Sequence, residues 1–165
     1  LNLLNKELKF IEKSADENLF CETFESEEKY NLSVLEIDKN EEILIFCPPT
    51  RGLLTKKMMP DKKHYGVDIT TAPNESVVAV MDGTVIFSSY TIEEGYVIAV
   101  QHIKDFISFY KHNSVLLKKT GDVVKSGESI AIVGNTGIGN TDNHLHFELW
   151  RNGNPQNPQD YIILE

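Results

Sequence analysis

The chain has 165 residues, of which 41% are hydrophobic, and a net charge of −9. This length allows one domain core with an appendage. Most of the charge is at one end, because residues 1–43 hold 12 acidic and 5 basic residues. Such an acidic segment repels nucleic acid and anionic lipid, so neither is an expected partner. No apolar run approaches the roughly 18 residues of a membrane span.

Residues 1–43 form an N-terminal appendage in this interpretation. Leu1, Leu4, Leu8 and Ile11 follow 3-4-3 spacing, which predicts an amphipathic helix of about three turns. The helix either packs on the body or belongs to a longer coiled coil with a partner. A polar connection and a weak strand at residues 32–37 follow it. The chain begins without a basic-then-apolar segment, so an export signal, if there is one, lies upstream or has been removed.

From Ile43 onward, short apolar alternations and turn residues predict a mainly β domain over residues 44–165, a compact antiparallel sheet. Asp82-Gly83 predicts a hairpin between two strands, because this pair tolerates positive φ. A second hairpin is expected at residues 103–105. The predicted strands are Ile43–Phe46, Val77–Met81, Thr84–Tyr90, Tyr96–His102, Phe106–His112, Ser129–Val133 and His144–Arg151.

The two cysteines give no metal signal. Cys21 and Cys47 belong to no CxxC pair, and neither has a histidine at ligand spacing. An oxidising compartment would permit a bridge between them, and two unpaired thiols are the alternative.

The first chemical element is His64-Tyr65-Gly66-Val67-Asp68. Spacing of four residues places His64 and Asp68 on one face of a strand or of a helix. Gly66 removes bulk between them and would let the backbone approach a bound ion. A single pair of this kind is also common in purely structural settings.

The second element is the run His144-Leu145-His146-Phe147-Glu148-Leu149. In a strand, His144, His146 and Glu148 share one face, and the apolar residues share the other. The apolar face would anchor the strand in a core while two imidazoles project from a rigid support. This arrangement favours metal binding or catalysis over a pair of exposed surface histidines.

Two further histidines end predicted strands. His112 follows Tyr110-Lys111, and His102 follows Gln101. His112 is a candidate functional residue only in combination with the two other elements. His102 is interpreted as a structural residue. Catalytic zinc takes three protein ligands and a water, and two histidines with one aspartate leave the centre at +1. The remaining imidazoles could then move protons near neutral pH.

Together these elements resemble the lysostaphin/LytM-type zinc metallopeptidases. The resemblance runs from about Ile45 to Ile163 and includes Tyr110-Lys111-His112, Gly134-Asn135-Thr136-Gly137 and His144 to Glu148. It also covers Asp82 to Val85, Gly121 to Glu128 and Asn157 to Tyr161. The resemblance implies an antiparallel β fold with Zn²⁺ in an open groove. It places the metal ligands on His64, Asp68 and His146 and the catalytic histidines on His112 and His144.

One stretch departs from the family pattern. Residues 138–143 are one residue longer than in many relatives and lack a Gly-Pro pair. Since this loop should border the groove, its change bears on substrate preference rather than on the metal.

The resemblance implies a cell-wall endopeptidase that cuts peptide cross-links in peptidoglycan, of the D,D type, in the cell envelope. The alternative is a non-catalytic regulator that binds and activates another wall hydrolase, with the acidic segment as its docking element. A phosphocarrier domain would not need Asp68, whose charge opposes a phosphohistidine. If the protein is an endopeptidase, residues 1–43 either limit access to the groove or pack elsewhere.

Overall fold

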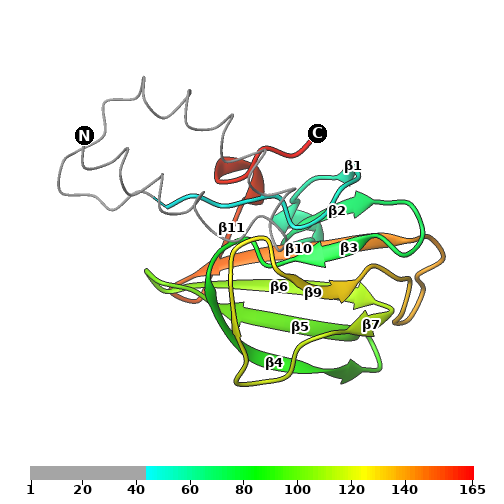
Figure 1. The fold of residues 1–165 in the computed structure, drawn as a ribbon. Helices are drawn as coiled ribbons and strands as arrows, with labels where there is room; N and C mark the ends of the chain where they lie inside the picture. The colour runs from blue at the N-terminus through cyan, green and yellow to red at the C-terminus, as the bar shows by residue number, and fades with distance from the viewer. Residues whose placement is uncertain (1–43) are drawn as a thin grey trace.

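The computed structural model describes residues 44–165. Its main feature is an eight-stranded antiparallel sheet in the order β1-β2-β10-β6-β5-β4-β8, with β11 paired to β10 (Figure 1). The strands are β1 (Leu53–Lys56), β2 (Val67–Thr70), β4 (Gly83–Thr91), β5 (Gly95–Gln101), β6 (Phe106–Asn113), β8 (Val123–Val124), β10 (His144–Arg151) and β11 (Asn154–Gln156).

A smaller sheet of three strands packs on one face of the large one. It consists of β3 (Ser76–Val78), β9 (Ser129–Ile132) and β7 (Val115–Leu116) in the order β3-β9-β7. Two short 3-10 helices, η1 (Pro60–Lys62) and η2 (Pro158–Asp160), complete the elements. Within residues 44–165, no helix has the length and apolar character that a membrane crossing requires.

The hydrophobic core lies between the two sheets. Leu145, Phe147 and Leu149 of β10 are fully buried and belong to one cluster with Val77 of β3 and Ile130 of β9. This face of the large sheet is called the inner face below. The strict alternation along β10 therefore sends His144 and His146 to the opposite, outer face.

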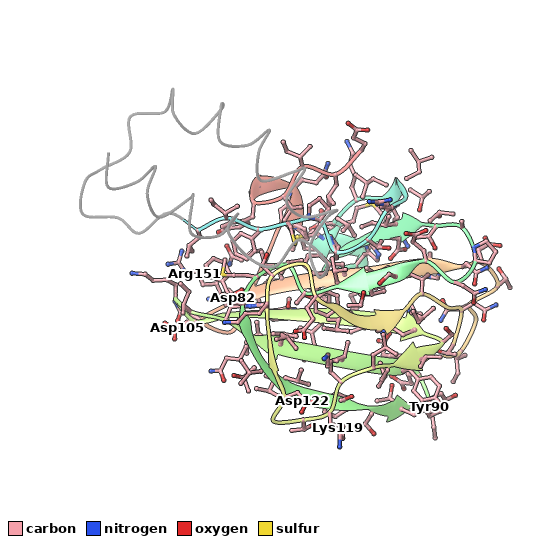
Figure 2. The ribbon with its side chains drawn as sticks, in the orientation of Figure 1. Asp82, Tyr90, Asp105, Lys119, Asp122 and Arg151 are labelled. Carbon is pink, nitrogen blue, oxygen red and sulfur yellow. The ribbon has the colours of Figure 1, made fainter. Side chains whose placement is uncertain are left out.

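The ends of the large sheet can be located from its turns. Tyr90 lies near the end of β4 at one end of the sheet, and Asp105 and Arg151 lie at the opposite end (Figure 2). β10 begins at the Tyr90 end, where the β4–β5 turn also lies (Figure 1). The histidines at the start of β10 are thus beside that turn.

The predicted antiparallel β fold is confirmed, and so is the hairpin between β5 and β6. β10 spans the predicted residues 144–151.

The hairpin predicted at Asp82-Gly83 is wrong, because β3 pairs with β9 and β4 pairs with β5 and β8. The chain instead crosses from one sheet to the other there. At Gly83 a Cβ would collide with the Gln101 carbonyl of β5, so glycine serves close strand packing rather than a tight turn.

Two further expectations need correction or restriction. Residues 44–46 are not in a strand, although Cys47 N donates to Val80 O at 2.9 Å. Cys47 is a buried free thiol, in line with the alternative of two unpaired cysteines. Its Sγ donates a hydrogen bond to the Ala79 carbonyl. The predicted helix, the acidic appendage, the strand at 32–37 and Cys21 lie outside the described residues.

Candidate metal centre

Two neighbouring strands bring the first and second chemical elements together. β2 and β10 pair antiparallel, and their register sets Asp68 opposite His146. His64 precedes β2 and is held by an isolated bridge to Met59. One ligand atom from each of His64, Asp68 and His146 lies within 4.8 Å of the others. The structure therefore gathers three donors that are up to 82 positions apart in the sequence.

Hydrogen bonds set which imidazole nitrogen faces the cluster. His64 Nδ1 lies 2.9 Å from the Lys57 carbonyl, which can only accept, so Nδ1 carries the proton and Nε2 has a free lone pair. That Nε2 lies 3.2 Å from Asp68 Oδ1. It is buried and has no hydrogen-bond partner in the described residues. His146 presents Nδ1 to the same oxygen at 2.7 Å.

The charge state of Asp68 suits a cation ligand. Burial alone would raise its pKa, but the hydrogen bond and charge of His146, together with His64, more than offset this and lower the pKa to about 2. The carboxylate is thus ionised at any physiological pH. A partly buried carboxylate between two imidazoles attracts a divalent cation.

Two other imidazoles lie against this cluster. The ring centroid of His112 is 5.0 Å from that of His144 and 5.9 Å from that of His146. His144 Nδ1 donates to the Asp142 carbonyl at 2.9 Å. His112 Nδ1 lies 2.9 Å from the Glu94 carbonyl and 3.1 Å from the Thr136 carbonyl. In both rings the backbone therefore fixes the proton on Nδ1 and leaves Nε2 able to accept one.

The pKa of His112 is lowered, chiefly by burial and then by the nearby His144 and His146. The Glu94 carbonyl and carboxylate act in the opposite direction without cancelling this effect. His112 is consequently neutral near pH 7, the state that a proton acceptor requires.

A bulge in β6 points His112 at the cluster. Tyr96 pairs with Asn113 and Ile98 with Tyr110, so Lys111 and His112 both oppose the single Val97. His112 has a φ of 68°, in the left-handed region. This local break sends both side chains to the outer face, where regular alternation would send only one.

Sequence spacing gave no sign of two neighbours of His112. Glu94, in the β4–β5 turn, places Oε2 3.8 Å from His112 Nε2. Asn140 Nδ2 donates to the Thr136 carbonyl at 2.9 Å, beside His112 Nδ1. Asn140 belongs to the atypical stretch 138–143, so that stretch does border the histidines, as expected. Only the three-dimensional arrangement reveals Glu94, because a solvated turn glutamate has no distinguishing pattern.

Glu148, which shares the face of His146, forms an ion pair with Lys111 at 2.6 Å. Its Oε2 is 3.9 Å from His146 Nε2, beyond hydrogen-bond distance. Glu148 is therefore the ion-pair partner of Lys111 and makes no hydrogen bond to His146.

The donor set fits zinc. Two imidazole nitrogens and one carboxylate oxygen are ligands of catalytic zinc sites, which keep a further position for water. The lone pair of the buried His64 Nε2 has no partner in the described residues, and a metal ion would satisfy it. The backbone contacts of His64 Nδ1 provide the outer hydrogen bond that orients such ligands.

His102 lies apart from these groups, in the core. Its Nδ1 donates to the Asp82 carbonyl at 2.8 Å, and its Nε2 is 2.8 Å from Ser108 Oγ. Ser108 Oγ is in turn 2.9 Å from the Tyr110 hydroxyl. All three side chains are buried, so this chain of hydrogen bonds has no access to a substrate.

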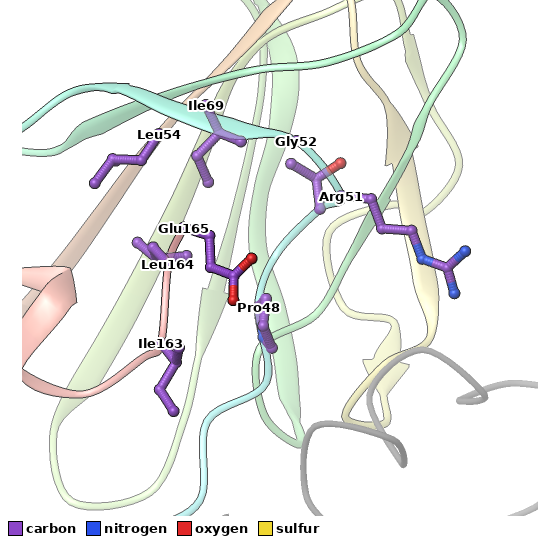
Figure 3. Close-up of a pocket in the computed structure, with 9 residues that line it drawn as sticks. Pro48, Arg51, Gly52, Leu54, Ile69, Ile163, Leu164 and Glu165 are labelled. Atoms are coloured by element: carbon purple, nitrogen blue, oxygen red, sulfur yellow. The ribbon is translucent and has the colours of Figure 1, made fainter. Parts of the chain in front are cut away.

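One hollow on the described part of the chain, of about 500 Å³, lies beside the histidines, because its lining includes Glu94, the neighbour of His112. Another, of about 170 Å³, contains none of the histidines (Figure 3). It is lined by Pro48, Thr50, Arg51, Gly52, Leu54, Ile69, Ile163, Leu164 and Glu165.

Comparisons with known proteins agree with this geometry. The catalytic domain of the antimicrobial peptidase lysostaphin from Staphylococcus simulans matches with a TM-score of 0.56 and 27% identity, over 68% of this chain and 87% of that one. A zinc containing peptidase from Vibrio cholerae matches with a TM-score of 0.55 and 30% identity, over 73% of this chain and 37% of that one.

A curated relative is the murein hydrolase activator NlpD of Escherichia coli, which is 34% identical over 116 residues, 69% of this chain and 30% of that protein. The chain spans only 23% to 33% of the length of the first curated relatives. Residues 62–158 match the model of peptidase family M23. This range contains all five residues that the family resemblance singled out, and the chain belongs to peptidase family M23.

Proposed function

We propose that this protein is a zinc metalloendopeptidase that hydrolyses peptide cross-links in bacterial peptidoglycan, with D,D specificity, in the periplasm or another extracytoplasmic part of the envelope. The observation that supports it best is the convergence of three ligand atoms within 4.8 Å, with two further imidazoles against them. His64, Asp68 and His146 are the proposed zinc ligands, and His112 and His144 the proposed catalytic residues.

Bound zinc would supply a Lewis acid that activates water and polarises the scissile carbonyl. The chain's own residues then handle protons. Nε2 of His112 or His144 accepts the proton of the attacking water, since the backbone holds the other nitrogen of each ring protonated. The second histidine donates a hydrogen bond to the developing oxyanion when it carries an additional proton on Nε2. The proton is finally delivered to the leaving amine.

The names of the similar proteins support this function class. Lysostaphin is named an antimicrobial peptidase, the Vibrio protein a zinc containing peptidase, and NlpD a murein hydrolase activator. These names suggest both the wall substrate and the envelope location for this chain.

Substitution of a ligand and of a catalytic histidine separates the two roles. His146→Ala is expected to lose bound zinc and hydrolysis together. His112→Ala is expected to keep zinc and to lose turnover by about 10²–10⁴-fold, the usual contribution of a positioned acid-base group. Zinc content by atomic absorption and mass spectrometry of digested peptidoglycan, with and without a chelator, measure both quantities. Full turnover by His112→Ala would refute the role of that residue.

The similarity to NlpD also favours a second candidate, a regulator that activates another wall hydrolase. A regulator needs the docking surface but no proton transfer at His112. Purified protein that releases no fragments from peptidoglycan alone, and that stimulates an added wall hydrolase equally well with His112→Ala, would establish this alternative. Release of cross-link cleavage products by the wild-type protein alone would reject it.

A further inference from the structure

Thr136, in the loop between β9 and β10, contacts both the main chain and the ring of His112. Its N–H makes a long hydrogen bond of 3.4 Å to the His112 carbonyl. Its own carbonyl accepts from His112 Nδ1 at 3.1 Å. A residue from a separate loop is thus bonded to the proposed catalytic histidine at two points.

The hydroxyl of Thr136 connects the two strands that flank the bulge. Its Oγ1 donates to the Asn113 carbonyl of β6 at 2.6 Å and accepts from the Tyr96 N–H of β5 at 3.1 Å. Tyr96 and Asn113 are the pair next to the register shift between β5 and β6. Because a bulge disrupts the ladder locally, a side chain that bonds to both strands there stabilises the irregular geometry.

His112 needs this support because its backbone conformation is unfavourable. Its φ of 68° lies in the left-handed region, which a residue with a side chain keeps only where its surroundings hold it. The hydroxyl of Thr136 holds Asn113, the next residue in the chain. Without that contact, β6 could relax toward regular alternation, in which Lys111 and His112 point to opposite faces of the sheet.

The β4–β5 turn fits closely against Thr136. A Cβ at Gly95 would collide with the side chain of Thr136, and the Ile138 N–H donates to the Glu93 carbonyl at 3.0 Å. The same turn supplies the Glu94 carbonyl, which lies 2.9 Å from His112 Nδ1. Thr136 therefore packs against the segment that carries the other carbonyl partner of the ring.

We propose that Thr136 is a positioning residue, whose hydroxyl holds the β6 bulge so that His112 keeps its proton on Nδ1 and presents Nε2 to the reaction. Thr136 acts through His112 and the two strands. Its effect on turnover rests on the proposed peptidase function, whereas its effect on the His112 ring does not.

Two substitutions separate the hydroxyl from the shape of the side chain. Thr136→Val keeps the shape and removes the hydroxyl, and in the zinc-loaded full chain it is expected to lower kcat about 10–100-fold with KM and zinc content unchanged. Thr136→Ser keeps the hydroxyl and is expected to keep most of the turnover. Kinetics on a purified cross-linked peptide fragment of peptidoglycan measure both values. If Thr136→Val does not fold, Thr136→Ala compared with Thr136→Ser makes the same distinction.

NMR shifts of the His112 ring nitrogens provide a readout that needs no turnover. The wild-type protein and Thr136→Ser are expected to show the single tautomer with the proton on Nδ1. In Thr136→Val both nitrogen shifts are expected to move toward the average of the two tautomers. The signals are assigned from their loss in His112→Ala.

Thr50→Val is the matched control. The Thr50 hydroxyl also donates to a backbone carbonyl, that of Ser76 at 2.8 Å, from a buried position. It lines the smaller hollow, which contains none of the histidines. This variant is expected to be less stable, with the kcat and the His112 shifts of the wild-type protein. An equal change of these shifts in both variants would show that Thr136 has no specific role.

The two proposals fail separately. Unchanged His112 shifts in Thr136→Val would overturn the positioning role, and so would a wild-type kcat in that variant, which would at the same time support the peptidase function. Shifts that change in Thr136→Val but not in Thr50→Val, in a protein that hydrolyses no cross-linked fragment, would support the hold of Thr136 on the ring and refute the peptidase function.

Discussion

At the scale of single residues, a strained backbone conformation places His112 beside the other histidines of the site. His112 has a left-handed φ of 68° within a bulge of β6. Such a conformation costs on the order of 1–3 kcal/mol in a residue other than glycine. Its N–H donates to the Glu94 carbonyl, and its Nδ1 meets two carbonyls. These contacts hold the ring beside His144 and His146. The sequence identified His112 by resemblance, but it could not reveal the bulge that turns the side chain outward.

His102 should make stability depend on pH. Burial lowers its pKa below the ordinary 6.5, so the unfolded chain binds a proton more readily than the folded one. Stability is then complete above the unfolded pKa and falls as the pH drops below it. Near pH 5.5 the loss reaches at most about 1.4 kcal/mol, the limit for a histidine that stays wholly neutral when folded.

Urea unfolding of the zinc-loaded protein at about pH 7.5 and about pH 5.5 measures this loss. In His102→Gln, which does not titrate, the difference between the two pH values should shrink. An NMR titration should show the His102 midpoint below that of an exposed histidine. A midpoint above 6.5 would contradict the neutral, buried state.

At the scale of secondary structure, the pairing of β2 with β10 creates the candidate metal site. The alternation in residues 144–151 was enough to predict β10 and its two faces, which the structure has as expected. Its neighbours could not be predicted in this way, because strand pairing over some 78 residues depends on the whole core. For the same reason the apparent hairpin at Asp82-Gly83 proved to be a crossing between sheets.

Gly66 should be essential for this pairing. The sequence suggested that it makes room for an ion, whereas a Cβ there would in fact collide with the Phe147 carbonyl of β10 and approach Glu148 Cγ at 2.7 Å. Gly66→Ala should therefore push β2 away from β10, reduce stability by about 1–3 kcal/mol and weaken zinc binding. Thermal unfolding and zinc titration measure the two effects.

Gly153→Ala is the matched control, since a Cβ at Gly153 meets nothing within 4 Å and only the left-handed φ of 75° opposes it. It should cost about 1–2 kcal/mol and leave zinc affinity unchanged. Zinc affinity lost equally in both variants would show that Gly66 has no specific role at the site.

At the scale of the whole molecule, the two faces of the large sheet have different tasks. The inner face packs on the small sheet and forms the described core, while the outer face carries the histidines and the adjoining hollow. Composition and alternation predicted the β class, and the family resemblance predicted the residues that cluster. The sheet order and the identity of Glu94 as a neighbour depend on long-range packing, which local pattern does not encode.

The division at residue 43 remains a proposal, and deletion of residues 1–43 tests it. Residues 44–165 contain a continuous hydrophobic core between their two sheets, and we expect them to fold alone and to unfold in one cooperative transition. Their zinc content and hydrolysis rate should equal those of the full chain, since the proposed ligands and catalytic histidines are all retained. Calorimetry and peptidoglycan digestion at matched concentrations provide the comparison. A markedly higher rate after deletion would instead show that the acidic segment limits access to the groove, with its carboxylates drawn to the +1 metal centre.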